Sequence, residues 1–166
     1  MPSDRPQVVE PRWLDGRQQR AWRQIIAGTT LLMDQLEREL RAEHGLTLAD
    51  YEILVHLSEA PERRLRMADL ADAASVSRSR LTHRVDRMTA QGLVERAPCP
   101  TDRRGTFAVL TPAGFSVIEA AAPTHVAGVR RYVVDPLDPA VLDAAGGALG
   151  TVAAAIRAAA EEQDQE

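Results

Sequence analysis

Residues 75–104, SVSRSRLTHRVDRMTAQGLVERAPCPTDRR, contain the pattern that decides the fold. The first half has a helical period, in which apolar residues recur at steps of four and three and form one narrow stripe, made of Leu81, Val85 and Met88. Ser77 stands where a helix needs an N-cap acceptor, and Gly92 stands where a helix must end. These signals predict one helix whose polar and basic side chains lie opposite its apolar stripe.

Two short runs with the character of β-strands follow this helix, at residues 93–96 and 106–110. A polar loop, PCPTDRR at 98–104, joins them, so the sequence predicts a hairpin with an arginine-bearing tip. Before the helix, the run MADLADAASV at 67–76 predicts another short helix and a tight turn. Two short helices joined in this way are typical of a helix-turn-helix, and the hairpin makes it a winged one. In that fold the second helix enters the major groove of DNA, and the wing reaches a flanking minor groove or phosphate.

The charge of this segment indicates its partner. Residues 75–104 contain seven arginines and three acidic residues, a local net charge of +4, whereas the whole chain carries −4, so the remainder carries −8. All 20 basic residues are arginines, which suit bidentate contacts to phosphate and guanine. Most charge runs are only the solvated face of a helix. Here the arginines cluster on one short segment of an acidic protein, which favours a nucleic-acid interface.

Composition limits the other possibilities. A chain of 166 residues fits one compact domain, or one domain with oligomerisation arms. A single cysteine excludes an internal disulfide and fits a reducing cytoplasm. We find no signal peptide and expect no membrane-spanning run, so the sequence predicts a soluble, cytoplasmic protein without a membrane partner. It contains no glycine-rich phosphate loop, nucleophile elbow or spaced carboxylate pair, so we expect no enzyme; its scattered histidines indicate no metal site or cofactor.

The fold class expected from these patterns is mainly α with a small β-hairpin wing, and two long helical regions flank the winged helix-turn-helix. Heptad-like apolar seams run through residues 22–40 and 142–156, and they are wider than the small central unit needs. For the first seam taken alone, a helix packed on the core of its own domain is an equal alternative. Pro123 should kink or break the helix that begins near Pro112, and a short helix near Trp13 is possible. The expected organisation is a flexible tail at 1–14, an N-terminal dimerisation helix at 15–45, a winged helix-turn-helix DNA-binding domain at 46–111, C-terminal dimerisation helices at 112–162 and a frayed tail at 163–166.

Two runs carry a resemblance to a known family: LADYEILVHL at 48–57, and LADAASVSRSRLTHRVDRMTAQGLVERAPCPTDRRGTFAVLTPAG at 70–114. With the order of elements, they resemble the MarR family of bacterial transcription regulators over roughly residues 20–160. The resemblance implies a homodimeric repressor that binds a pseudo-palindromic operator in double-stranded DNA. It also implies release of the operator by a small, often phenolic, effector or by oxidation.

The resemblance also implies site residues. Asp102 and Arg104 match the wing motif D-x-R of the family, in which the arginine enters the minor groove and the aspartate orients it. The expected DNA contacts are Ser77, Arg78, Ser79, Arg80, Thr82, His83 and Arg84 in the helix, with Arg103 and Arg104 in the wing. Asp86 is a second candidate for orienting a neighbouring arginine, and a plain surface charge is its alternative. Two departures are noted: Ser75 replaces a frequent glycine in the turn, and Arg66 at an N-cap position cannot accept a hydrogen bond.

An effector site is expected where the flanking helices meet the winged unit. The candidates are Trp22, Arg23, His44, Tyr51 and His56, each with packing or surface exposure as its alternative. Cys99 lies between two prolines near several arginines, which leaves a redox-sensing regulator as an alternative function. A winged-helix protein-interaction module is the other alternative, although such a module would expose aromatic and leucine side chains in place of arginine, serine, threonine and histidine.

Overall fold

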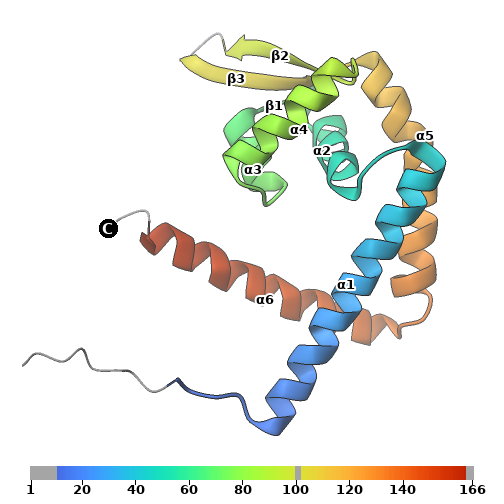
Figure 1. Ribbon diagram of the computed structural model, residues 1–166, viewed down its shortest axis with the longest axis vertical. Coiled ribbons are helices and arrows are strands. Elements are labelled where there is room, and N and C mark those ends of the chain that lie inside the picture. The colour runs from blue at the N-terminus through green and yellow to red at the C-terminus, as the bar shows by residue number, and fades with distance from the viewer. Residues whose placement is uncertain (1–10, 100–101, 164–166) are drawn as a thin grey trace, which may run out of the picture. The chain divides into compact units, whose positions relative to one another are not determined.

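The computed structural model describes residues 11–99 and 102–163, and for residues 103, 104, 161 and 163 it describes the backbone alone. The expected fold class is confirmed: helices dominate, and one small antiparallel sheet forms the wing (Figure 1). The elements in chain order are α1 (Gly16–His44), α2 (Leu48–Glu59), a 3-10 turn η1 (Pro61–Arg63), β1 (Arg64–Arg66), α3 (Met67–Ala73), α4 (Arg78–Ala90), β2 (Val94–Cys99), β3 (Asp102–Leu110), α5 (Pro112–Val129), a π-helical turn η2 (Arg130–Val134) and α6 (Pro139–Gln163).

The chain divides into two compact units, residues 1–34 and residues 35–166. In the first unit, Asp15 caps α1, because its Oδ1 accepts hydrogen bonds from the backbone N–H groups of Arg17 and Gln18, both at 2.8 Å. The helix considered near Trp13 is not formed: residues 11–15 have no regular structure, and Trp13 is 84% exposed. The helix begins only after this cap, so Trp13 stays outside it.

In the second unit, local signals place α2, α3 and α4 as the sequence indicates. Thr47 caps α2, its Oγ1 accepting from the N–H of Asp50 at 3.0 Å, and Ser77 caps α4, its Oγ accepting from the N–H of Arg80 at 3.4 Å. Both expected departures are confirmed. Ser75 in the turn has a φ of 53°, the left-handed region that favours glycine, and Arg66 at the N-cap of α3 makes no side-chain capping bond.

The sheet has the order β1-β3-β2, and all of its pairs are antiparallel. Leu65 lies opposite Ala108, and Val94 lies opposite Leu110. The hairpin is longer than predicted: most of the residues expected in its loop belong to β2 or β3, and residues 100 and 101 lie outside the described part of the chain. Pro98 is tolerated because β2 is an edge strand, where a missing N–H faces no further partner.

The core of this unit lies between α2, the helix-turn-helix formed by α3 and α4, and the inner end of the sheet. Its fully buried large side chains are Leu40, Ile53, Leu54, Leu57, Leu70, Leu81, Val85, Met88 and Val94. The predicted stripe of α4 is therefore confirmed as its buried face. Leu36 and Leu40, which belong to the first heptad-like seam, are also buried within the chain, so this end of the seam is internal core.

Of the kink or break predicted at Pro123, the break is wrong, because α5 continues from Pro112 to Val129. Proline removes one helical hydrogen bond, and the buried residues on both sides of it, Ile118, Ala121 and Gly128, hold the helix in place. Gly128 allows a close approach of α1: a Cβ built on it would lie 2.7 Å from Leu36 Cδ2 and 2.8 Å from Glu39 Oε2.

Helix α6 is apolar and largely exposed. Val141, Leu149, Val152 and Ile156 are each at least half exposed. Its span Pro139–Ala160, with a mean hydropathy of 1.5, is long and apolar enough to cross a membrane by length and composition. The expectation that the chain contains no such run is therefore wrong. Alanines supply much of this hydropathy, and a search for runs of large apolar residues overlooks them.

Candidate nucleic-acid interface

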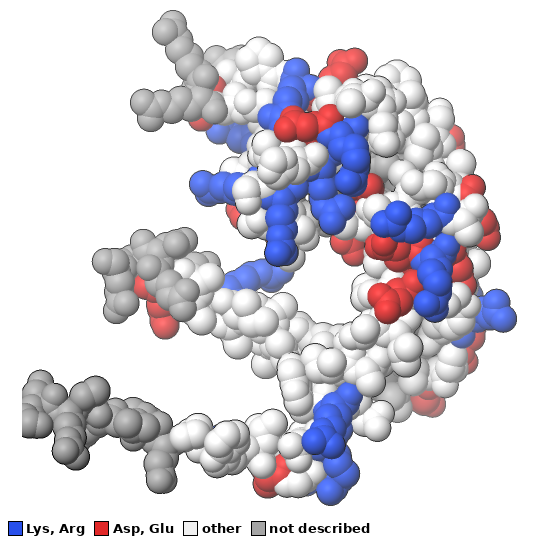
Figure 2. Space-filling view, in the orientation of Figure 1, with Lys and Arg blue, Asp and Glu red and all other residues white. Residues whose placement is uncertain are grey.

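The outer face of α4 presents the polar side chains that the sequence assigns to DNA. Leu81, Val85 and Met88 are 0–1% exposed, which fixes the rotation of the helix. The residues opposite or beside that stripe are exposed, and they are Ser77, Arg78, Ser79, Arg80, Thr82 and His83. Figure 2 shows arginine side chains gathered over the region of α3 and α4 on the face in view. The structure thus brings all but one of the predicted helix contacts onto one accessible surface.

Arg84 is the exception, because a carboxylate inside the unit engages it. Asp50 of α2, whose side chain is only 9% exposed, accepts from Arg84 Nη1 at 3.2 Å. Arg87 Nη2 contacts both oxygens of the same carboxylate at 2.6 Å. Arg84 Nη1 also lies 3.4 Å from Thr47 Oγ1, so the side chain is directed toward α2. We call Asp50, Arg84 and Arg87 the α2–α4 clamp.

A second contact ties the opposite flank of α4 to the wing. Asp86 Oδ1 accepts from Arg96 Nη2 of β2 at 2.9 Å, and the same nitrogen lies 3.5 Å from the carbonyl oxygen of Thr82. Asp86 was expected to orient a neighbouring arginine, and Arg96 is the arginine it contacts. Sequence reasoning did not assign Arg96, since only the pairing of β2 beside α4 brings these residues together.

The outer part of the wing is described in part. Asp102 Oδ2 lies 3.8 Å from Arg66 Nη1, at the end of β1, and a Cβ on Gly105 would lie 3.1 Å from the same carboxylate oxygen. Arg103 and Arg104 follow in β3, and their side chains lie outside the described part of the chain. Their contacts with DNA, and the orienting role of Asp102, stay predictions.

Comparison with known proteins agrees with this geometry. The family model described as MarR family matches residues 44–105, which span the helix-turn-helix and most of the wing. AbsC, a MarR family transcriptional regulator from Streptomyces coelicolor with a known crystal structure, is 47% identical to this chain, and the two structures superpose with a TM-score of 0.85. The match covers 89% of this chain and 99% of AbsC. The chain belongs to the MarR family.

Other relatives support the same assignment. Sco3205, a MarR family transcriptional regulator from Streptomyces coelicolor solved in complex with DNA, is 45% identical with a TM-score of 0.84, over 86% of this chain and 90% of that one. The transcriptional regulator PecS of Dickeya dadantii is 28% identical over 131 residues, 77% of this chain and 74% of its own length. As a member of this family, the protein is a DNA-binding transcriptional regulator and not an enzyme.

The effector candidates of this MarR-family protein fall into separate places. Trp22 and Arg23 are exposed residues of the first unit. In the second unit, His44 Nε2 lies 2.8 Å from Thr124 Oγ1, and buried Tyr51 packs against His125 with ring centroids 4.5 Å apart. His56, on the same helix as Tyr51, is half-buried.

Sequence reasoning missed His125, which turns out to be the most unusual histidine of the described residues. Its Nδ1 is buried without a hydrogen-bond partner in the described structure, and burial lowers its pKa below the usual range. Burial also raises the pKa of its neighbour Tyr51. The spacing from Ile118 to His125 is seven residues, two helical turns, so periodicity alone places the imidazole on the inner face of α5.

Cys99 is less accessible than a redox sensor requires. The residue is 6% exposed at the end of β2, and its Cβ lies 3.0 Å from the position that a Cβ on Gly105 would take. Reactive cysteines occupy partly exposed sites. The position of Cys99 therefore gives no support to the redox alternative.

Proposed function

We propose that this MarR-family protein is a cytoplasmic, homodimeric repressor that binds a pseudo-palindromic operator in double-stranded DNA and leaves it when a small effector binds. The observation that carries the DNA part is the exposed polar and basic face of α4 beside a wing, on a chain that is otherwise acidic. Sco3205, which is 45% identical and was solved with DNA, supports the same use of these elements here.

In this proposal, α4 lies in the major groove and its N-terminal half reads the bases. Ser79 and His83 occupy the middle of the exposed face, and hydroxyl and imidazole groups can donate to or accept from base edges. Arg80 lies beside them, where a guanidinium can contact guanine or phosphate. We leave Arg84 out of the proposed DNA contacts, because the α2–α4 clamp uses its charge inside the unit.

The wing is proposed to bring Arg104 into the flanking minor groove, with Asp102 orienting it and Arg103 beside it, as the family motif implies. Replacing Arg104 with alanine should weaken operator binding by about 1–3 kcal/mol, the range of a good arginine contact to DNA, and leave the assembly state unchanged. Replacing Arg41, an exposed arginine of α1 that pairs with Glu37, gives a control with the same loss of charge. Equal affinities of the Arg104 and Arg41 variants would reject the wing assignment.

Dimerisation is proposed from the apolar surface that each unit leaves exposed. In the first unit, Trp22, Ile25 and Ile26 are 45–53% exposed on α1. In the second unit, the seam of α6 runs through Leu149, Val152 and Ile156, which are 51–65% exposed. Because these side chains are already about half buried, covering the rest gives roughly 1 kcal/mol each. A two-fold dimer would present two copies of α4 to half-sites about 34 Å apart.

The dimer can be tested with charged substitutions in α6. Leu149→Glu should give monomers in light scattering after gel filtration, because the carboxylate would be buried in the apolar interface. Ala154→Glu, on the opposite face of the same helix, should leave the dimer intact. A Leu149→Glu protein that remains dimeric would refute this interface. A wild-type protein that is monomeric and floats with lipid vesicles would instead assign α6 to a membrane.

An effector site is proposed near α2 and α5, around His44, Tyr51, His56 and the missed His125. A cavity of about 430 Å³ is lined by residues of α1, α5 and η2, among them Glu39, Thr124 and Arg131. None of the four candidates lines it, and His44 adjoins it through its contact with Thr124. Aromatic, amphipathic molecules such as phenols fit the chemistry of tyrosine and histidine side chains. Trp22 and Arg23 stay candidates from the first unit. Release of labelled operator by a panel of phenolic acids, compared between wild type and Tyr51→Ala, tests this assignment.

The first experiment measures affinity for the DNA upstream of the protein's own gene and for a scrambled duplex, across a salt series. We expect tight binding to one sequence, with a steep salt slope from counterion release. Equal, weak binding to both duplexes would mean that this DNA is not the operator. The experiment would then be repeated with sequences selected from random duplexes, and failure to select any would refute sequence-specific binding.

A further inference from the structure

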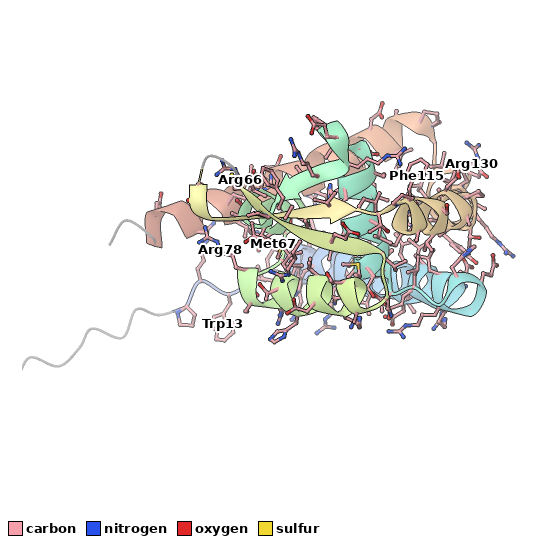
Figure 3. The ribbon with its side chains drawn as sticks, turned by 90° about the horizontal axis from the view of Figure 1, so that it is seen from above. Trp13, Arg66, Met67, Arg78, Phe115 and Arg130 are labelled. Atoms are coloured by element: carbon pink, nitrogen blue, oxygen red, sulfur yellow. The ribbon has the colours of Figure 1, made fainter. Side chains whose placement is uncertain are left out.

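A cavity of about 390 Å³ lies where the N-terminal end of α3, the outer flank of α4 and the wing meet. Figure 3 shows three of its lining residues, Arg66, Met67 and Arg78, near the hairpin. Arg66 comes from the junction of β1 and α3, and Arg78 is the first residue of α4. This volume is within the usual range of small-ligand sites, about 300–1,000 Å³.

The charges around this cavity favour an anion. Three of its lining residues are arginines from three different elements, Arg66, Arg78 and Arg96, and the lining contains one carboxylate, that of Asp102. Arg96 is fixed by Asp86 at 2.9 Å, and Arg66 lies 3.8 Å from Asp102, near the outer limit of an ion pair. The lining residues carry a net charge of +2, which falls to +1 when Asp86, the partner of Arg96 from outside the lining, is counted. Guanidinium groups held in place bind oxyanions with good geometry.

The geometry of DNA indicates which anion this is. The major and minor grooves of a duplex are separated by a sugar–phosphate strand. A protein that places α4 in the major groove and its wing on the adjacent minor groove must let that strand pass between the two elements. This cavity lies between α4 and the wing, with Thr82 on one side and Thr106 on the other.

We propose that this cavity seats one backbone phosphate of the operator, and that Arg66, which lies outside the recognition helix and the wing tip, donates to it together with Arg78. The inference rests on the proposed docking of α4 and the wing. It adds a phosphate contact from the β1–α3 junction, which would fix how deeply the helix-turn-helix sits on DNA without reading sequence.

The test compares Arg66→Gln with Arg64→Gln. Both residues are in β1 and both changes remove one positive charge, but Arg64 pairs with Glu62 at 2.6 Å and does not line the cavity. Arg66→Gln should weaken binding to operator and to scrambled DNA by similar factors and reduce the salt slope by about 0.9, the value for one lost phosphate contact. Arg64→Gln should keep the wild-type slope.

A chemical arm locates the phosphate. In a series of operator duplexes, each carries one neutral methylphosphonate in place of a different phosphate. At one position this replacement should weaken the binding of the wild-type protein but should not weaken the binding of Arg66→Gln any further. Arg78→Gln, in an exposed residue on the same cavity, should respond to the same linkage, and it keeps the test valid if Arg66→Gln does not fold. Circular dichroism and urea midpoints establish that each variant is folded.

The outcomes separate the two levels of the argument. The proposed phosphate contact alone is overturned if folded Arg66→Gln and Arg78→Gln bind DNA with the affinity and the salt slope of the wild type. It is also overturned if Arg64→Gln and Arg66→Gln lose the same amount of DNA affinity. Variants that change the binding of free inorganic phosphate but not of DNA assign the cavity to a small anion and also overturn it. Wild-type protein without sequence-specific, salt-dependent binding overturns the proposed function, and the phosphate contact with it.

Discussion

Replacing Asp50 with alanine would leave Arg84 and Arg87 of α4 without their shared carboxylate, while the apolar contacts of α2 stay in place. Removing one partner of a fully buried ion pair costs about 3–5 kcal/mol. Here the arginine side chains are 31% and 50% exposed, so water can solvate them after the change, and we discount the cost to about 2–3 kcal/mol. For a chain of this size, that loss corresponds to a fall of about 4–12 °C in the unfolding midpoint.

The assay is urea unfolding followed by circular dichroism, with the free energy taken from a midpoint shift at constant m-value. Glu52→Ala, in an exposed residue two positions further along the same helix, is the control and should change the free energy of unfolding by less than about 0.5 kcal/mol. Asp50→Ala and Arg87→Ala should couple in a double-mutant cycle. An Asp50→Ala variant as stable as Glu52→Ala, or additive losses in the cycle, would refute the clamp.

Arg84→Ala should likewise lower stability and leave the salt slope of DNA binding unchanged, whereas Arg80→Ala should reduce the slope.

Three further predictions concern single positions. Ser75→Gly should raise the free energy of unfolding by about 0.5–1 kcal/mol in urea melts, because glycine relieves the positive φ but costs entropy in the unfolded chain; a loss of stability would mean that Ser75 is unstrained. Gly128→Ala should cost about 1–3 kcal/mol, since its Cβ would meet Leu36, while Gly147→Ala, with open space around it, should be neutral or stabilising in the same assay. Burial lowers the pKa of His125 in the folded protein, so the unfolded chain binds the proton more readily. The free energy of unfolding is therefore at its full value above pH about 6.5, the pKa of histidine in the unfolded chain, and it falls as the pH drops from there to the pKa in the folded protein. His125→Gln should flatten that part of the stability–pH curve, and an identical curve would contradict the argument.

The features that the sequence predicts well are those with local causes. The cap at Ser77, the stripe from Leu81 to Met88 and the strain at Ser75 each depend on residues a few positions apart. The same holds for the outward face of α4, because burying one side of a helix fixes the direction of the other. The helical period therefore places Ser79, Arg80, Thr82 and His83 away from the core, whereas the other candidate DNA contacts come from the resemblance to the family.

The features that escaped prediction depend on residues distant in sequence. Arg84 looks like a surface arginine until α2 brings Asp50, 34 residues earlier, against it. A heptad-like pattern of apolar residues predicts a contact but not the element that makes it. Leu36 is buried within the chain and Leu149 is exposed on α6, although both belong to the same kind of sequence pattern. Pro123 predicted a break because its local cost was visible, whereas the packing of Ile118 and Gly128 that opposes it was not.

Helix α4 is held on both flanks by elements that belong to other parts of the unit. The α2–α4 clamp holds one flank, and Arg96 of the wing holds the other through Asp86. Asp50 is adjacent in the chain to Tyr51, which packs against His125 of α5. The two neighbours thus join α2 to α4 and to α5 at a single point. Tyr51 of the proposed effector site and Asp50 of the α2–α4 clamp are neighbours along α2. A ligand that displaces Tyr51 would therefore disturb the carboxylate that holds α4 through Arg84 and Arg87.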